Sequence, residues 1–245
     1  MNPAIALLAG VIGYLIGSIS FARLMVRIRA PGVDVSTIEH PVGGNSETFK
    51  SGSIGATAIR LQLGARYGCL AGVLDILKGL LPTLAFKLFQ PDAPYYLIAA
   101  TMATIGHNYP VYYGFEGGRG FATIYGGFLV LDWVGVLVTN VAGIMLGGLL
   151  GQALMMRYAG LVLMIPWIWF RTHDVAKLAY VVFANILFWF AIMPELRQIL
   201  RLRTDAERPD EQQVADYMGM GNVYRLVKRF RLSDVIGKVK KGDGS

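Results

Sequence analysis

A polar, glycine-rich segment between two long apolar runs carries the residue types that bind an anion. It covers 106–123 and reads GHNYPVYYGFEGGRGFAT, with Arg119 among Gly117, Gly118 and Gly120. Glycines let a backbone approach a ligand closely and adopt positive φ angles. Backbone N–H groups beside an arginine are donors that suit a phosphate. The segment therefore predicts a phosphate-binding loop at the edge of a membrane.

Two further polar segments accompany this loop. One is SGSIGAT, at 51–57, whose hydroxyls and small residues offer hydrogen bonds to an anion, although such segments are more often plain loops. The other contains Asp75 and Lys78, which are three residues apart and so share a helix face, where they can pair. Ionisable residues within a span are costly and usually face a polar cavity. The alternative is a structural ion pair that ties helices together.

His107 and Asn108 stand at the start of the glycine-rich segment. A lone histidine is more often a hydrogen-bonding structural residue than a catalytic one, and this one precedes a turn at Pro110. The residue types alone leave both roles open.

The composition is that of a membrane protein. The chain has 245 residues, of which 54% are apolar and 16% charged, and its mean hydropathy is +0.49. Soluble domains usually carry about 25% charged residues. Several apolar runs approach the roughly 20 residues that cross a bilayer. We therefore expect an all-α, polytopic integral membrane protein, and its single cysteine, Cys69, excludes an intramolecular disulfide.

The apolar runs predict about seven transmembrane helices. The expected spans are 4–26, 68–89, 94–113, 120–137, 138–156, 158–171 and 174–194. The fourth and fifth form one continuous apolar stretch, which length alone divides near Val138–Asn140. The spans belong to a membrane-embedded domain, 1–198, and a basic tail covers 199–245.

Two segments are too polar to span. Residues 35–67 predict a loop and then a short amphipathic or re-entrant helix from about Gly55. Its apolar side chains are expected near the membrane face: Ile59, Leu61 and Leu63. The other segment follows the last span; within it, the acidic Thr204–Asp216 predicts a flexible linker. The basic Tyr224–Lys241 predicts either an amphipathic helix on anionic headgroups or a solvated tail.

The distribution of basic residues predicts the orientation. With seven spans and the N-terminus outside, one side receives most of the basic residues, namely Arg23, Arg27, Arg29, Arg119, Arg157, Arg197, Arg201 and Arg203. We therefore place the glycine-rich segment and the C-terminus in the cytoplasm, with the protein in the inner (plasma) membrane. The net charge of +7 indicates attraction to a membrane surface. No nucleic-acid partner is expected, because no binding motif accompanies the charge.

Three motifs together resemble a known family. SGSIGAT, DILKG at Asp75–Gly79 and GHNYPVYYGFEGGRGFAT occur in the order and spacing of the bacterial acyl-phosphate:glycerol-3-phosphate acyltransferases, the PlsY type, over about 5–205. The resemblance implies a seven-helix membrane enzyme that transfers an acyl group from acyl phosphate to the 1-hydroxyl of glycerol 3-phosphate. Lysophosphatidate and phosphate would be the products, in the first committed step of phospholipid synthesis. It implies no metal, cofactor, acyl-carrier protein or coenzyme A, and leaves the oligomeric state unknown.

The resemblance also implies a set of site residues. His107, Arg119 and Ser51 are expected to be catalytic. The expected substrate contacts are Gly52, Ser53, Gly55, Thr57, Arg60, Asp75, Lys78, Asn108, Gly117, Gly118, Gly120 and Thr123. Acyl phosphate is already activated, so positioning of the hydroxyl and neutralisation of the leaving phosphate suffice as a working mechanism. No general base is evident, and we hypothesise that a phosphate oxygen of a substrate accepts the hydroxyl proton.

Several polar positions depart from the family's pattern. Ser53 and Ala58 stand where the family has asparagines, and Glu195 stands where it has a histidine. Arg119 replaces a lysine, and Glu116 replaces another basic residue. The planar fork of arginine is not equivalent to an ammonium. These departures leave open a divergent or weakly active paralogue with another acceptor or donor. They are also compatible with a lipid or anion transporter on the same fold, or with a structural membrane subunit.

Overall fold

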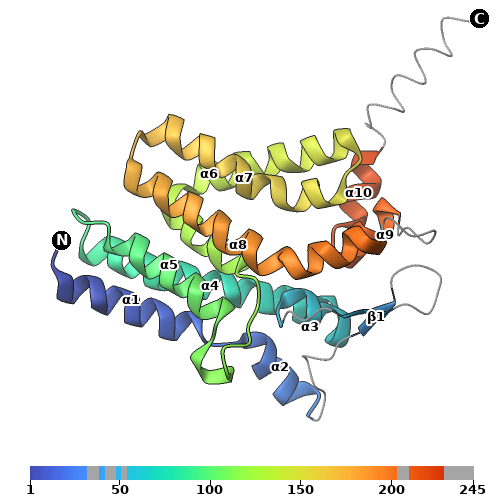
Figure 1. Ribbon diagram of the computed structural model, residues 1–245, viewed down its shortest axis with the longest axis horizontal. Coiled ribbons are helices and arrows are strands. Elements are labelled where there is room, and N and C mark those ends of the chain that lie inside the picture. The colour runs from blue at the N-terminus through green and yellow to red at the C-terminus, as the bar shows by residue number, and fades with distance from the viewer. Residues whose placement is uncertain (32–38, 42–47, 51–53, 203–209, 229–245) are drawn as a thin grey trace, which may run out of the picture.

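The computed structural model describes residues 1–31, 39–41, 48–50, 54–202 and 210–228. Helices packed side by side make up most of it (Figure 1). Five of them are long and apolar enough to cross a membrane: Pro3–Arg29, Ala65–Phe89, Phe121–Leu150, Ala153–Thr172 and Val175–Arg197. The expected polytopic, helical membrane fold is confirmed, and the number of spans and the orientation of the termini stay predictions.

The elements follow one another in a simple order. They are α1 (Pro3–Gly17), α2 (Phe21–Arg29), β1 (Glu39–Pro41), β2 (Thr48–Lys50), α3 (Ala56–Leu63), α4 (Ala65–Phe89), α5 (Tyr95–Asn108), a 3₁₀ turn η2 (Val111–Tyr113), α6 (Phe121–Leu150), α7 (Ala153–Thr172), α8 (Val175–Leu202), α9 (Glu211–Tyr217) and α10 (Gly221–Val227). The two short strands pair antiparallel. Helix α5 is shorter than the expected third span, and α7 begins before the expected sixth.

Helices α1 and α5 pack closely along one another because α1 has glycine at the contact. A Cβ at Gly13 would overlap the carbonyl oxygen of Ala99, and one at Gly17 would overlap that of Ala103. Small residues at such contacts let helix backbones approach in a membrane, where van der Waals packing drives association. This contact holds α5, and with it the start of the glycine-rich segment, against the N-terminal helix.

Helix α6 folds back on itself at Asp132. The backbone of Asp132 is non-helical, with φ −158° and ψ 95°. Tyr125 donates its hydroxyl hydrogen to Asn140 Oδ1 at 3.0 Å, whereas a straight helix would separate residues fifteen apart by about 22 Å. Figure 1 shows the change of direction within α6. The two expected spans are thus two segments of one element, but the predicted division at Val138–Asn140 is wrong.

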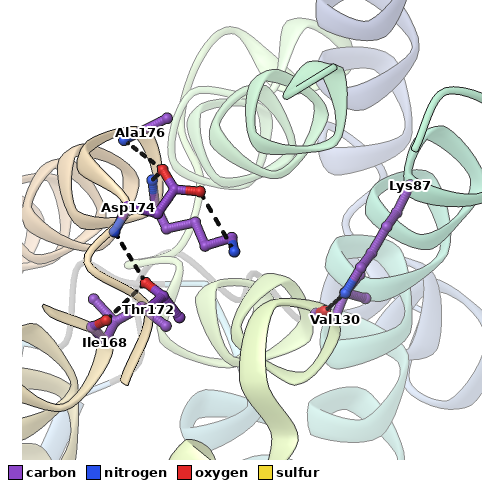
Figure 2. A network of polar contacts seen from close by, with 7 residues as sticks. Lys87, Val130, Ile168, Thr172, Asp174 and Ala176 are labelled. Atoms are coloured by element: carbon purple, nitrogen blue, oxygen red, sulfur yellow. Dashed lines mark hydrogen bonds and ion pairs between the residues drawn. The ribbon is translucent and has the colours of Figure 1, made fainter. Parts of the chain in front are cut away.

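The break lies at Asp132 because its carboxylate starts the second segment. Asp132 Oδ1 accepts the N–H of Gly135 at 3.0 Å, as an N-cap does. Its Oδ2 accepts from Trp167 Nε1 at 3.1 Å and pairs with Arg171 Nε at 2.6 Å. Lys87 Nζ donates to the carbonyl of Val130, close to the end of the first segment (Figure 2). A division by length alone cannot detect such a cap.

Asp174 starts the next helix at the same end of the bundle. Its Oδ1 accepts the N–H groups of Ala176 at 2.9 Å and Lys177 at 3.2 Å, and its own N–H donates to Thr172 Oγ1 (Figure 2). These are the N-terminal N–H groups of α8, which have no partner within the helix. The cap therefore fixes the turn between α7 and α8.

Helix α3 begins at Ala56, close to the position expected from the sequence, but its apolar side chains do not all face lipid. Ile59 is fully buried and packs in a cluster with residues of α2 and α4, including Val26 and Ala71. Leu63 packs against the same cluster. The lack of a side chain at Gly68 lets α4 approach α3 closely, because a Cβ there would overlap the Arg60 side chain. The expectation that Ile59 lies at the membrane face is therefore wrong.

The C-terminal helices α9 and α10 pack on the bundle, at the end opposite the N-terminus (Figure 1). The side chain of Asp210 and the N3 residue Gln213 form a capping box at the start of α9. Buried side chains from both helices join the main core: Val214, Ala215, Met218 and Tyr224. The expected flexible linker is therefore wrong for Asp210–Asp216. Residues 229–245, which hold most of the predicted basic amphipathic helix, lie outside the described residues, and the division at 198 stays a prediction.

Candidate active site

A cavity of about 80 Å³, lined by both charged and apolar side chains, lies where α3, α4, the end of α5, the start of α6, α7 and α8 come together. Its lining residues are Gly55, Ala56, Thr57, Ala58, Asp75, His107, Arg119, Gly120, Phe121, Ala122, Arg157, Tyr158 and Phe188. The expected site residues among them come from all three motifs. The fold thus brings together segments that are far apart in the sequence, in a space suited to a small polar group.

The glycine-rich loop wraps around the end of α5. The N–H of Gly118 donates to the carbonyl of His107 at 3.1 Å. A Cβ on Gly118 would overlap His107 Nε2, and one on Gly117 would overlap the His107 carbonyl oxygen. Gly120 has φ +76°, and a Cβ there would lie 2.7 Å from Asn108 Oδ1. These glycines are therefore required by packing against His107 and Asn108, whereas the sequence suggested close approach to a ligand.

Asp75, Lys78 and His107 form a buried cluster beside the cavity. Lys78 Nζ lies 2.9 Å from Asp75 Oδ1, which confirms the expected pair. Lys78 Nζ also donates to the carbonyl of Ile19 at 2.8 Å. His107 Nδ1 lies 3.6 Å from the same Asp75 oxygen. Asp75 and His107 line the cavity and Lys78 does not, so the lysine supports Asp75 and joins α4 to the break after α1.

Arg119 projects from the glycine-rich loop onto an acidic residue of α8. Its Nη1 pairs with Glu195 Oε2, and the two side chains are 17% and 4% exposed. The other carboxylate oxygen, Oε1, accepts the hydroxyl hydrogen of Tyr217 at 3.0 Å. Burial lowers the pKa of the Arg119 guanidinium below its usual range, and Tyr158 and Tyr217 oppose that shift. A phosphate arriving at Arg119 therefore meets a cation that already has an anionic partner.

Two further arginines stand at this end of the bundle. Arg157 lines the cavity, lies over the ring of Phe121 at 5.2 Å from its centroid, and donates to the Met218 carbonyl at 2.8 Å. Arg60 is not among the lining residues and donates to the carbonyls of Asp216, at 3.0 Å, and Tyr217. The sequence singled out Arg60 for substrate, and used Arg157 only for orientation.

The remaining expected residues are placed as follows. Asn108 and Thr123 are buried, and Asn108 Nδ2 and Oδ1 and Thr123 Oγ1 have no hydrogen-bond partner among the described residues. Buried polar groups of this kind commonly bind water or a ligand. Ser51, Gly52 and Ser53 lie outside the described residues. Within the described chain, no three His, Cys, Asp or Glu side chains gather to hold a metal ion, and the metal-free reaction stays a prediction.

Tyr158 lines both this cavity and an apolar groove of about 390 Å³ along α7 and α8. The other residues of this groove are Leu146, Leu154, Met155, Ala159, Val162, Leu163, Trp189, Ile192 and Leu196. A cavity that contains charged side chains thus adjoins an apolar groove, and Tyr158 lines both. Together they suit a molecule with a polar head and a hydrocarbon chain.

Comparison with known proteins agrees with this geometry. Residues 7–204 match the family model described as glycerol-3-phosphate acyltransferase. Over 144 residues the chain is 34% identical to the glycerol-3-phosphate acyltransferase of Aquifex aeolicus, covering 54% of this chain and 68% of that one. It is 41% identical to that of Myxococcus xanthus, covering 54% of this chain and 60% of the relative.

A solved structure shares the fold. The crystal structure of PlsY, an integral membrane glycerol 3-phosphate acyltransferase in its glycerol 3-phosphate form, superposes with a TM-score of 0.67 at 28% identity. The match covers 81% of this chain and 93% of that one. Helices α9 and α10 lie beyond the residues that match the family model. The chain belongs to the glycerol-3-phosphate acyltransferase family.

Proposed function

We propose that this protein transfers an acyl group from acyl phosphate to the 1-hydroxyl of glycerol 3-phosphate, and so makes lysophosphatidate for phospholipid synthesis. Membership of the family supports acyl transfer in a membrane and glycerol 3-phosphate as the acceptor. The observation that carries the proposal is the junction at Tyr158, where a cavity containing Arg119 and Arg157 meets an apolar groove. The phosphate of acyl phosphate suits the cavity, and its acyl chain suits the apolar groove.

The proposed reaction needs no covalent enzyme intermediate. The 1-hydroxyl oxygen attacks the carbonyl carbon of acyl phosphate, the bond from that carbon to the phosphate oxygen breaks, and phosphate leaves. The hydroxyl proton passes to a phosphate oxygen. Arg119 and Arg157 hold the phosphate groups so that the hydroxyl oxygen lies against the carbonyl carbon, and they offset the negative charge that grows on the leaving phosphate. Asp75 and His107 support the loop that carries Arg119.

We also propose that the cavity faces the cytoplasm, from the inner (plasma) membrane. Basic residues gather near this end of the bundle, including Arg27 and Arg29 in the last turn of α2. Such residues favour the cytoplasmic side. The acceptor is a soluble, charged molecule, and a cavity at that face would receive it directly from water.

The test is a direct assay of the purified protein in lipid nanodiscs. Acyl phosphate and glycerol 3-phosphate should give lysophosphatidate and equal amounts of phosphate. Arg119→Ala should reduce kcat/KM by at least about a hundredfold, the usual cost of removing one charge-stabilising donor. Arg171→Ala is the matched control, because Arg171 pairs with Asp132 at the other end of the bundle.

Two results would contradict the proposal. One is the absence of product from acyl phosphate while acyl coenzyme A serves as a donor. The other is an Arg119→Ala protein that is as active as the Arg171→Ala protein.

A further inference from the structure

The helix pair α9–α10 lies outside the family match and is nevertheless firmly docked. Glu211 Oε2 accepts the N–H of Ala153, at the start of α7, at 2.8 Å. The Tyr224 hydroxyl donates to the carbonyl of Gly151 at 3.3 Å. A Cβ at Gly148 would overlap the side chain of Val227. These contacts anchor the pair on the end of α6, the start of α7 and the turn between them.

The C-terminal end of α9 presents three successive carbonyls to two arginines. Arg60 donates to those of Asp216 and Tyr217, and Arg157 donates to that of Met218. Carbonyls at a helix C-terminus lack partners within the helix and carry its negative dipole end. The burial of Arg60 and the charge of Arg157 lower the pKa of Arg60, as expected for two cations held near each other. The carbonyls offset that repulsion.

Tyr217 connects the same helix to the third arginine. Its hydroxyl binds Glu195 Oε1, while Glu195 Oε2 pairs with Arg119. A carboxylate with both oxygens available can bind a guanidinium through two parallel hydrogen bonds, and such pairs are strong. With one oxygen held by Tyr217, Glu195 meets Arg119 through the other. Arg119 then keeps N–H groups for another anion.

We propose that α9–α10 is a positioning element of the active site, added to the part of the chain that matches the family. It fixes Arg60 and Arg157 through the α9 carbonyls, and through Tyr217 it limits the hold of Glu195 on Arg119. The element thereby keeps Arg119 and Arg157, which line the cavity, available to the phosphate of glycerol 3-phosphate. The inference rests on the proposed function for its substrate, and Tyr217 is its specific positioning residue.

The test compares Tyr217→Phe with Tyr224→Phe in the full chain. Each variant loses one hydroxyl from α9–α10, but only Tyr217 contacts the Arg119–Glu195 pair. We expect Tyr217→Phe to raise the KM for glycerol 3-phosphate about fivefold, the effect of one net hydrogen bond, with kcat little changed. Tyr224→Phe keeps the Tyr217 contact and the anchors at Glu211 and Gly148, so it should lower the melting temperature and raise that KM less than Tyr217→Phe does. An unchanged KM in Tyr217→Phe, or an equal rise in both variants, would overturn the inference.

A second measurement separates this inference from the proposed function. Inorganic phosphate should raise the melting temperature of the wild-type protein, and Tyr217→Phe should need about fivefold more phosphate for the same rise. This readout requires no turnover. A wild-type protein that makes no lysophosphatidate would overturn the proposed function only. Equal phosphate dependence in wild type and Tyr217→Phe would overturn the positioning role.

Discussion

Arg119 and Glu195 form a buried ion pair that joins the glycine-rich loop to the last long helix. The pair connects the cavity lining, through Arg119, to α9, since Tyr217 binds the same carboxylate. It also means that the loop has a counterion of its own before any substrate arrives. The strength of this pair therefore helps to set how readily the cavity accepts a phosphate.

Glu195→Gln should destabilise the unliganded protein and make it more responsive to glycerol 3-phosphate. Removing one partner of a buried ion pair costs up to about 3–5 kcal/mol, because the other charge stays buried. A bound phosphate would supply the missing anion, so the ligand should raise the melting temperature more than in wild type. Thermal unfolding with and without the ligand measures both effects. Glu116→Gln is the control, because the Glu116 side chain is 77% exposed; equal ligand responses in the two variants would contradict the prediction.

Gly118→Ala should disrupt the loop and reduce activity. Its Cβ would overlap His107 Nε2, so either the loop or the imidazole must move, at a cost of about 1–3 kcal/mol. We expect kcat/KM to fall by at least about tenfold, since small misplacements of positioning groups are costly. Gly72→Ala in α4 is the matched control, because its Cβ would meet the Ala56 Cβ at an ordinary 3.6 Å. Similar activities for both variants would show that the close contact does not matter.

Asp132→Ala should destabilise the fold-back in α6 without changing substrate binding. The variant loses the N-cap on Gly135 and the pair with Arg171. The cap alone contributes about 1 kcal/mol. Asp132→Asn keeps an oxygen for the cap and should lie between the alanine variant and wild type in melting temperature. A rise in the KM for glycerol 3-phosphate as large as that of a cavity variant would argue against the assigned structural role.

Cysteine labelling should place Glu116 and Asp92 on opposite sides of the membrane. Both are exposed, in the loops that follow and precede α5. The experiment starts from Cys69→Ser, because Cys69 is itself exposed. A membrane-impermeant maleimide applied to intact cells should label Asp92→Cys and spare Glu116→Cys, and inverted vesicles should give the reverse. Labelling of both residues from one side would contradict the proposed orientation.

The sequence predicted the helical membrane fold because apolar runs mark long buried helices directly. Hydropathy could not locate the fold-back at Asp132, since that turn depends on one carboxylate, its cap and its contacts with α7. The two expected spans on either side of it were therefore divided in the wrong place. The capping box at Asp210 and Gln213 was readable in principle. The acidic composition around it favoured a linker and concealed the short helix.

The sequence predicted those residues of the candidate site that lie in segments of unusual local composition. Charged residues in an apolar run and glycines beside an arginine stand out, and Asp75, His107 and Arg119 were found in this way. Arg157, Glu195 and Tyr217 were not assigned to the site, because their roles come from contacts between distant helices. The departure at Glu195 was visible in the sequence, but the ion pair that accounts for its burial was not.

The docking of α9 on Arg60 and Arg157 bears on the order in which the protein matures. A ribosome makes both arginines, and all five of the long apolar helices, before it reaches the carbonyls of Asp216 and Met218. Until those carbonyls are synthesised, Arg60 and Arg157 lack these partners, and water must hydrate their guanidinium groups instead. The contacts at this end of the site therefore require that the chain has been synthesised as far as Met218.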